Sequence, residues 1–469
     1  MTGSALQERR FEPVLVYSAT AGLGAVRLTT LLSLAVAPFA IGCRYPPAYV
    51  PLLVVVFGAG AYSLYRETAQ RRAGVVMAAV PGERVLLALI AVVALQLVPL
   101  PPALLRVVSP GSFSFYNDRL LLPLSAWKPI TASPPDTARG LVFLAAMALL
   151  YRAVYREFDH PTWRRRLVIG IVTAGFFMTI EALVQQAYSA HVIYGVWRPL
   201  FDWAVFGPYI TKNLFAGYML MAVALGMALC LESLDALRRA WKRRRRRAWL
   251  ALGDAEGNAF LRWAAISMVL VTGLLATGSR GGLLGLAAIA ATFVVVARRR
   301  GTTVLAVALV AALGLAWIGL AEHRAGFVTR GLSVRREVWI DSLSMIPDHP
   351  VFGAGFNAFG TSYPPRQHVW RTLWIGTTHN EYLQIVIDLG LAGVIPAGLL
   401  MWTLLRRGAA AARVGPLQAG AFAGVVAVMA HNLVDYNWQL AANAATFAAL
   451  AGLAMQSPSG HLDPLRRPA

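Results

Sequence analysis

Charged residues, and acidic residues most of all, are few in this sequence of 469 residues. Only 14% of the residues are charged and 57% are hydrophobic, which excludes an ordinary soluble chain. The 22 Asp and Glu stand against 43 Lys and Arg, a formal net charge of +21. Such an excess can indicate nucleic-acid binding, but the basic run at 241–247 lies between two apolar segments and has few aromatic residues on which bases could stack. The composition predicts a polytopic membrane protein with no nucleic-acid partner.

Cysteine is equally scarce, and several catalytic motifs are missing. Cys43 and Cys230 are too few for a disulfide framework or a thiolate metal site. The sequence also lacks a Gly-rich loop ending in Gly-Lys-Ser/Thr, a Gly-x-Ser-x-Gly elbow and a His-Glu-x-x-His pair. No Asp-x-Asp cluster occurs in the segments expected outside the membrane. We therefore expect no metal and no cofactor, and we expect cationic side chains to bind any phosphorylated substrate.

Long apolar segments are abundant. A helix needs about 20 apolar residues to cross a bilayer. Charged or turn-rich stretches separate twelve candidates, which lie at 26–42, 48–65, 84–107, 139–155, 167–187, 213–231, 263–278, 281–297, 303–320, 381–403, 417–433 and 439–455. The sequence predicts an all-α integral membrane protein, a bundle of about twelve transmembrane helices.

The basic residues predict how the bundle is oriented. Lys and Arg collect in cytoplasmic loops, and a cytoplasmic N-terminus places every dense basic cluster on that face. These clusters lie at 9–10, 66–72, 164–166, 238–247, 298–300 and 406–413. Both termini are then cytoplasmic, Cys43 and Cys230 lie near opposite faces, and the run at 241–247 contacts anionic lipid head groups. Membrane lipids are therefore predicted partners.

Four regions follow from this topology. Residues 1–206 hold the first five spans, 207–320 hold spans six to nine with the basic cytoplasmic loop, and 381–469 hold the last three spans and a cytoplasmic tail. The region between them, 321–380, is a large outer loop. It contains a helix-like stretch at 335–345 and a turn-dense run at 348–357, rich in the Gly and Pro that tight turns require.

Arg280 is a charged residue at a predicted membrane boundary, where its presence needs a physical explanation. It stands at the outer membrane boundary among Gly278, Gly281 and Gly282. An arginine at this depth is costly unless it snorkels, pairs or binds an anion. One interpretation is a turn between two spans. The other is that the glycines leave room for a bulky head group while the guanidinium binds its phosphate oxygens.

His379 stands where the outer loop meets the tenth span. A histidine can exchange a proton near neutral pH, which general-base catalysis requires. A lone interfacial histidine is more often structural, but Asn380, Gln384 and Asp388 follow with a spacing of four residues. They form one polar stripe that should face the bundle interior.

Three further features lie on the predicted outer side. Lys212 enters the sixth span, and Arg335 and Arg336 lie in the long loop, where each could bind an anion or anchor the chain at the interface. His431 and Asp435 have a spacing that could hold a metal on a helix, although an interhelical hydrogen bond is the better interpretation.

These motifs together resemble the O-antigen ligase and O-antigen polymerase family, bacterial inner-membrane glycosyltransferases that use undecaprenyl-diphosphate-linked glycans. The resemblance runs through 207–218, 277–282, 335–355, 379–393 and 431–443. It implies that His379 is the catalytic base and that Arg280 and Arg335 bind substrate. The family's sixth-span motif commonly reads Asn-Arg-Asn-His, whereas this chain has Thr211-Lys212-Asn213-Leu214, which keeps the charge and loses the guanidinium fork. Arg336, Lys212, Asn213, Asn380 and Glu381 complete the predicted substrate-binding set.

The resemblance implies a metal-independent, inverting glycosyl transfer at a periplasmic active site in the bacterial inner membrane. The donor would be an undecaprenyl-diphosphate-linked glycan. An acceptor on the lipid A core would make the protein an O-antigen ligase, another lipid-linked repeat would make it an O-antigen or exopolysaccharide polymerase, and a protein side chain an oligosaccharyltransferase. Outside the enzyme class, a lipid-glycan flippase or permease would use the same cations only to bind substrate in transit, but the sequence lacks the clear inverted repeats that favour a transporter.

Overall fold

The computed structural model is all-helical. It describes residues 12–119, 127–199, 204–244, 253–296, 326–368 and 374–456. The only β-type pairings among these residues are three isolated bridges. The predicted span at 303–320 lies outside the described residues.

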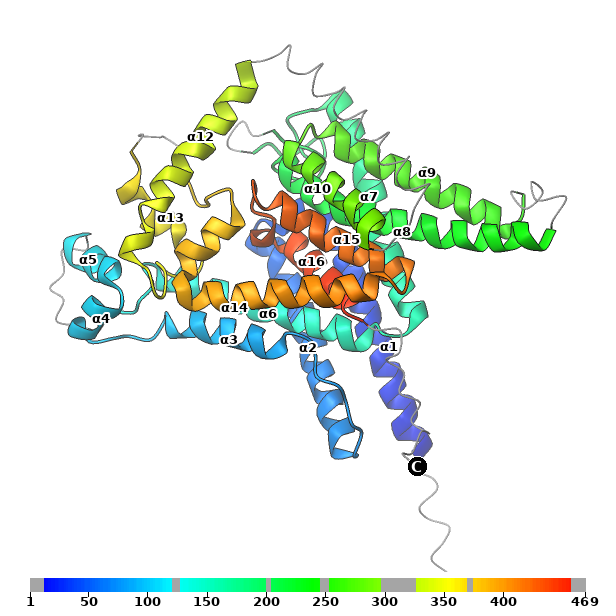
Figure 1. The fold of residues 1–469 in the computed structure, drawn as a ribbon, viewed down its shortest axis with the longest axis horizontal. Coiled ribbons are helices and arrows are strands. Elements are labelled where there is room, and N and C mark those ends of the chain that lie inside the picture. The colour runs from blue at the N-terminus through cyan, green and yellow to red at the C-terminus, as the bar shows by residue number, and fades with distance from the viewer. Residues whose placement is uncertain are drawn as a thin grey trace, which may run out of the picture.

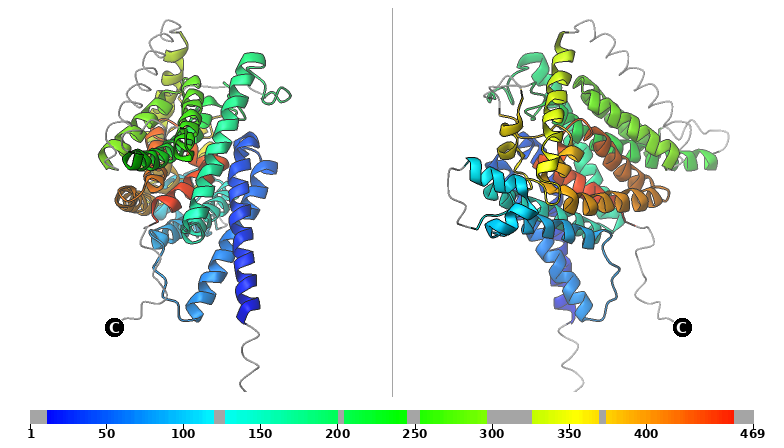
Figure 2. Two further views of the ribbon diagram at one scale, coloured as in Figure 1. Left: turned by 90° about the vertical axis from the view of Figure 1, so that its right-hand side faces the viewer. Right: turned by 60° about the vertical axis from the view of Figure 1, so that its left-hand side comes forward.

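Seven helices of the described chain are long and apolar enough to cross a membrane. They confirm an all-helical, multi-pass membrane protein. Figures 1 and 2 show α1 and α2 projecting together from the rest of the bundle. The seven are α1 (Glu12–Val36), α2 (Pro46–Arg72), α6 (Pro134–Glu157), α7 (Pro161–Tyr188), α8 (Lys212–Arg244), α9 (Ala255–Ala276) and α14 (Glu381–Ala412).

Shorter apolar helices lie where three further spans were predicted. These are α10 (Arg280–Ala291), which continues in a π turn to Val296, α15 (Pro416–His431) and α16 (Ala441–Ala454). Most residues of α15 are buried, and nearly every residue of α16 is buried. Twelve spans therefore stay a prediction, because only seven of the described helices have the length and composition to cross.

The prediction of one continuous span at 84–107 is wrong. Helix α3 (Glu83–Leu95) ends before a turn, and the chain resumes as α4 (Pro102–Val108) and α5 (Pro110–Arg119). Three prolines, Pro99, Pro101 and Pro102, lie in or beside the break. Proline lacks an N–H and disfavours helical geometry in the preceding residue, so an apolar run with these prolines cannot stay one helix.

The segment 326–368 is partly helical, as predicted. It holds α12 (Gly326–Leu343) and the short α13 (Phe359–Ser362), and Figure 1 shows both at the left of the molecule, beside α4 and α5. Val338 of α12, Phe359 and Tyr363 pack with Ile387 of α14 in a small core of their own. The segment is thus packed directly on α14.

Helix α14 is interrupted at the point where the turn-dense run at 348–357 packs against it. Gly390 has φ 55° and ψ −163°, which interrupts the helix. The backbone of the run fills the gap: Leu391 N–H donates to the Pro350 carbonyl at 3.0 Å, and Ala354 N–H donates to the Ile387 carbonyl at 2.8 Å. Gly353 faces Gly390 so closely that a Cβ on Gly390 would lie 2.5 Å from the Gly353 nitrogen. We call this contact the glycine seam.

Candidate functional site

His379 lies in an unusual backbone conformation at the start of α14. Its φ of 55° is positive, which is uncommon for a residue other than glycine. The imidazole meets the edge of the Tyr436 ring with centroids 4.9 Å apart, and its Nδ1 is buried with no hydrogen-bond partner among the described residues. Trp339 of α12 donates its indole N–H to the Thr378 carbonyl at 2.8 Å. Helix α12 and the α15–α16 connection therefore both contact the histidine's surroundings.

Arg335 belongs to the same cluster, where it contacts the carboxylate of Asp435. Its Nη2 lies 3.4 Å from Oδ2 of Asp435, and the Arg335 side chain is only 22% exposed. Asn213 at the start of α8 also hydrogen-bonds the Asp435 side chain. Arg336, its neighbour on α12, is exposed instead. The structure therefore places Arg335, and not Arg336, beside the Asp435 carboxylate.

Arg280 and Lys212 form the third side of this cluster. Arg280 is exposed at the first residue of α10, where the Ser279 hydroxyl caps the helix by accepting from the Gly282 N–H. Arg280 and Lys212 lie close enough for their charges to repel each other. Neither side chain pairs with a carboxylate within the described part of the chain. Their unneutralised charge makes this a place for an anion.

The glycines beside Arg280 serve the packing of the protein. A Cβ on Gly281 would lie 2.2 Å from Cδ2 of His431, and one on Gly282 would crowd Leu274. The predicted room for a head group at these two residues is therefore wrong, because protein side chains already occupy it. What the small residues allow is a close approach of α10 to α15, and this places Arg280 next to the α15–α16 connection.

His431 belongs to a buried hydrogen-bond network. Its Nδ1 lies 2.9 Å from Nδ2 of Asn437, whose amide oxygen accepts from Nδ2 of Asn443 at 3.0 Å. Asn443 in turn accepts from the Tyr209 hydroxyl and donates to the Leu214 carbonyl. The hydrogen-bonding interpretation of His431 is confirmed. The network ties α8, α15 and α16 together beneath the cationic cluster.

Burial and charge set the protonation of the cluster. Burial, together with the nearby positive charge of Arg335, lowers the pKa of His379 from 6.5 to about 4. Burial raises the pKa of Asp435 from 3.8 to about 6, while Arg335 acts in the opposite direction. At neutral pH His379 is consequently neutral, the form that can accept a proton.

Asn380 and Glu381 have structural partners. The Asn380 side chain caps α14 by accepting from the N–H groups of Tyr382 and Leu383 at 3.0 and 3.1 Å. The buried Glu381 carboxylate accepts from the Trp438 N–H at 2.9 Å and the Gln439 amide at 3.2 Å. These bonds fix the start of α14 against the α15–α16 connection. Contact of either residue with substrate stays a prediction.

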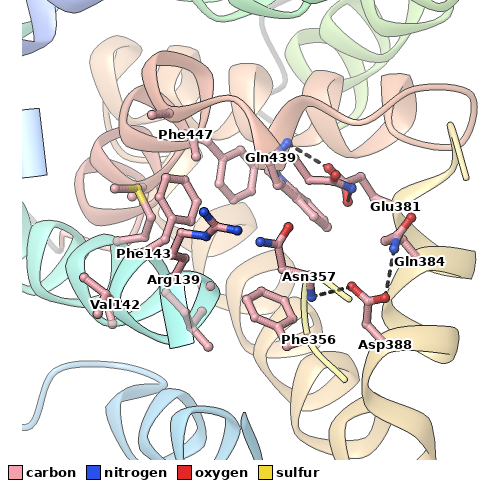
Figure 3. A pocket seen from close by; sticks show the side chains of 18 of the residues that line it. Arg139, Val142, Phe143, Phe356, Asn357, Glu381, Gln384, Asp388, Gln439 and Phe447 are labelled. Atoms are coloured by element: carbon pink, nitrogen blue, oxygen red, sulfur yellow. Dashed lines mark hydrogen bonds between the residues drawn. The ribbon is translucent and has the colours of Figure 1, made fainter. Parts of the chain in front are cut away.

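A cavity of about 1010 Å³ lies on the other side of this connection. Gln384 and Asp388, the buried members of the predicted polar stripe, line it together with Glu381, so the stripe faces the interior as expected. Figure 3 shows Arg139 of α6 reaching toward Asn357 across from them. Arg44 also lines the cavity. Sequence reasoning did not single out Arg44 or Arg139, because each is an isolated arginine beside an apolar segment.

The described site is that of a membrane-embedded protein in which three cations lie near a neutral histidine, and only Arg335 of the three pairs with a carboxylate among the described residues. Comparison with known proteins agrees with the family resemblance. Residues 264–398 match the family model described as O-antigen ligase, which includes Arg280, Arg335 and His379. The chain is 34% identical over 158 residues to a protein of Pseudomonas aeruginosa named O-antigen ligase. This alignment covers 34% of the chain and 36% of that protein, so it spans about a third of the relative's length. The resemblance to the O-antigen ligase family that the motifs predicted is confirmed over residues 264–398.

Proposed function

We propose that this protein transfers a glycan from undecaprenyl diphosphate to a hydroxyl of the lipid A core, on the periplasmic side of the bacterial inner membrane. The observation that carries the proposal is the convergence of His379, Arg335, Lys212 and Arg280 around one short connection. These residues come from four separate elements. A cationic cluster around a neutral base suits a reaction in which a diphosphate leaves while a hydroxyl loses its proton.

The reaction needs a base for the acceptor hydroxyl and positive charge to stabilise the leaving diphosphate. His379 removes the proton from the acceptor hydroxyl, whose oxygen attacks the anomeric carbon. The bond from that carbon to the diphosphate oxygen breaks, and its electron pair leaves with the lipid diphosphate. Arg280, Arg335 and Lys212 stabilise the charge that builds up on the leaving group. Attack by one acceptor on the face opposite the leaving group inverts the anomeric configuration.

Arg335 can serve in this way while it stays bound to Asp435. A guanidinium carries five N–H donors, and the Asp435 contact uses only part of this capacity. Asp435 thereby orients the planar group, and the remaining donors are available to phosphate oxygens. The resulting mechanism needs no metal, since the cations act on the diphosphate directly.

The proposal is tested with the purified full-length chain, a defined undecaprenyl-diphosphate glycan, a lipid A core acceptor and EDTA. Transfer should proceed in EDTA. The substitution His379→Ala should lower kcat by about 10²- to 10⁴-fold, which is the usual contribution of a positioned base. The matched control is His368→Ala, since His368 lies in the same segment but is exposed and pairs with Asp341.

Two results would contradict the proposal. Full transfer by the His379→Ala protein would remove the base from the mechanism. A wild-type protein that binds the lipid-linked glycan and carries it across vesicle membranes without forming a glycosidic bond would be a flippase. If transfer occurs only to a second lipid-linked repeat, the same chemistry would define a polymerase, and the lipid A core would be the wrong acceptor.

A further inference from the structure

The cavity beside the catalytic cluster has the walls of a lipid-binding site. Apolar side chains from six helices line it, among them Leu53 of α2, Leu89 of α3, Phe143 of α6, Leu400 of α14, Met429 of α15 and Phe447 of α16. Two of its lining residues, Val50 and Val142, are also 47% and 49% exposed at the protein surface. They belong to α2 and α6, both long and apolar enough to span a membrane. The cavity therefore opens toward the bilayer interior.

One end of the cavity is polar, and its carboxylates are already engaged. Asp388 accepts from the Asn357 N–H at 3.0 Å and from the Gln384 amide at 2.9 Å, and Glu381 binds the Trp438 N–H and the Gln439 amide. Figure 3 shows these side chains along one wall, opposite Arg139. The basic side chains that line the cavity are Arg44 and Arg139.

Arg139 and Arg44 supply positive charge at this end. The Arg139 side chain is 65% exposed and pairs with Asp136, one turn earlier in α6. Arg44 is half-buried and has no carboxylate partner among the residues that the structure describes. Its charge acts on Tyr436, the same residue whose ring meets His379. Arg44 thus connects the polar end of the cavity with the surroundings of the proposed base.

The two sets of cations come from different elements. Arg280, Lys212 and Arg335 come from α10, α8 and α12, whereas Arg44 precedes α2 and Arg139 lies in α6. None of the first three lines the cavity, although Trp438 and Gln439 of the α15–α16 connection do. A transfer between two membrane-anchored molecules requires two lipid-accessible sites that meet at one base. The α15–α16 connection lies between the two sets, because its Tyr436 ring contacts His379 and its Trp438 and Gln439 line the cavity.

We propose that the cavity binds the lipid anchor of the acceptor and that Arg44 and Arg139 bind its anionic head group. This inference rests on the proposed glycosyl transfer and places the lipid A part of the proposed acceptor, an anionic glycolipid, in the cavity, with its apolar chains entering beside Val50 of α2 and Val142 of α6. The head group then lies at the polar end, from which the acceptor sugar extends toward His379.

Binding is measured first, without catalysis. The probe is bis-phosphorylated lipid A, titrated into the full-length His379→Ala protein in detergent and followed by native mass spectrometry. The double variant Arg44→Gln, Arg139→Gln should bind lipid A at least about tenfold more weakly, equivalent to about 1.4 kcal/mol. Lipid A without phosphates should bind the parent weakly and should not distinguish the two proteins. Arg106→Gln is the matched control, because Arg106 is an exposed arginine of α4 outside the cavity.

A second variant tests the apolar part. Val142→Trp places a large ring at the cavity opening, at a position that is already half exposed, so folding should be retained. It should weaken lipid A binding without changing the thermal unfolding temperature. Unchanged lipid A binding in both the arginine and the tryptophan variants would overturn the proposal.

Kinetics then distinguish the two substrates. In the wild-type background, Arg44→Gln and Arg139→Gln should raise KM for the lipid A acceptor about tenfold or more and leave KM for the lipid-diphosphate donor unchanged, while Arg280→Gln should do the reverse. A rise in the donor KM alone would assign the cavity to the donor and contradict the inference. If the wild-type protein transfers no glycan, the proposed function fails, but the binding measurement still decides whether the cavity takes an anionic lipid.

Discussion

At the scale of single residues, the central property of the site is the neutral state of His379. Burial and the charge of Arg335 both favour the unprotonated ring. A neutral imidazole can accept a proton over the whole physiological range. The same surroundings make it a weaker base than a solvated histidine, so catalysis depends on how closely the acceptor hydroxyl is positioned.

This property predicts the pH dependence of the wild-type protein. The protonated ring cannot accept a proton, so kcat/KM should fall as the pH drops through the pKa of His379 in the free protein. That pKa is about 4, so the acid limb should lie well below the ordinary histidine value of 6.5. In Arg335→Gln the loss of a like charge should raise the pKa of His379 and move the acid limb to higher pH. Arg336→Gln, which alters the exposed neighbour, should leave it in place.

Initial rates at low donor concentration, measured from about pH 3 to pH 8, provide the check. A wild-type acid limb near 6.5 would mean that the ring is solvated in the working protein. An equal displacement in both arginine variants would assign the effect to the net charge of α12 and not to Arg335.

The same scale shows what the sequence could predict. The residue types and their position at the predicted membrane edge single out His379, Arg280 and Lys212, and the structure brings them together with Arg335. The sequence alone could not distinguish Arg335 from Arg336, because only the fold shows which of the two reaches Asp435. Arg44 and Arg139 were not predicted, since nothing in their neighbours separates a ligand-binding arginine from an ordinary membrane-edge anchor.

At the scale of elements, the apolar pattern located most helices but not their breaks. Helices α6, α7, α9 and the first part of α14 lie where apolar runs predicted spans. The interruption of α14 could not be read from the sequence, because Gly390 lies inside a predicted apolar span and resembles any helical glycine. It depends on the pairing with Gly353, which is 37 positions earlier in the chain and contacts it only in the folded protein.

The glycine seam should tolerate no side chain. In Gly390→Ala the Cβ would meet the Gly353 nitrogen at 2.5 Å, and the backbone there has a geometry that L-residues rarely adopt. We expect a loss of roughly 2 kcal/mol or more in the free energy of unfolding, from backbone strain and steric overlap. Thermal unfolding in detergent measures it.

Gly398→Ala is the matched control in the same helix. A Cβ at Gly398 meets nothing within 4 Å, so alanine should be neutral or stabilise α14 by about 0.5–1 kcal/mol. If both variants unfold at the wild-type temperature, the seam contributes nothing to stability.

At the scale of the whole molecule, the distribution of basic residues predicts one orientation in the membrane. Residues 73–82, next to Arg71 and Arg72, should then lie in the cytoplasm, and residues 189–199 should lie outside. Both connections contain well exposed positions, Val76 at 88% and Val196 at 86%. The native thiols are sheltered by comparison, because Cys43 is 2% exposed and Cys230 lies half-buried in α8.

Single cysteines can therefore report the topology. In intact spheroplasts a membrane-impermeant maleimide should label Val196→Cys, and it should label Val76→Cys only after permeabilisation. The chain without an added cysteine measures the background from the native thiols. The opposite labelling pattern would invert the topology and would place the cationic cluster on the wrong face for a periplasmic glycan.

The glycine seam also bears on how chains of this kind could be recombined. Because the backbone of 350–355 replaces the missing turn of α14, neither piece is complete without the other. A chimera that imports residues 326–368 from a relative, to change the substrate it accepts, must import α14 from the same donor. A graft that takes residues 326–368 from one protein and α14 from another would combine two segments that do not fit each other.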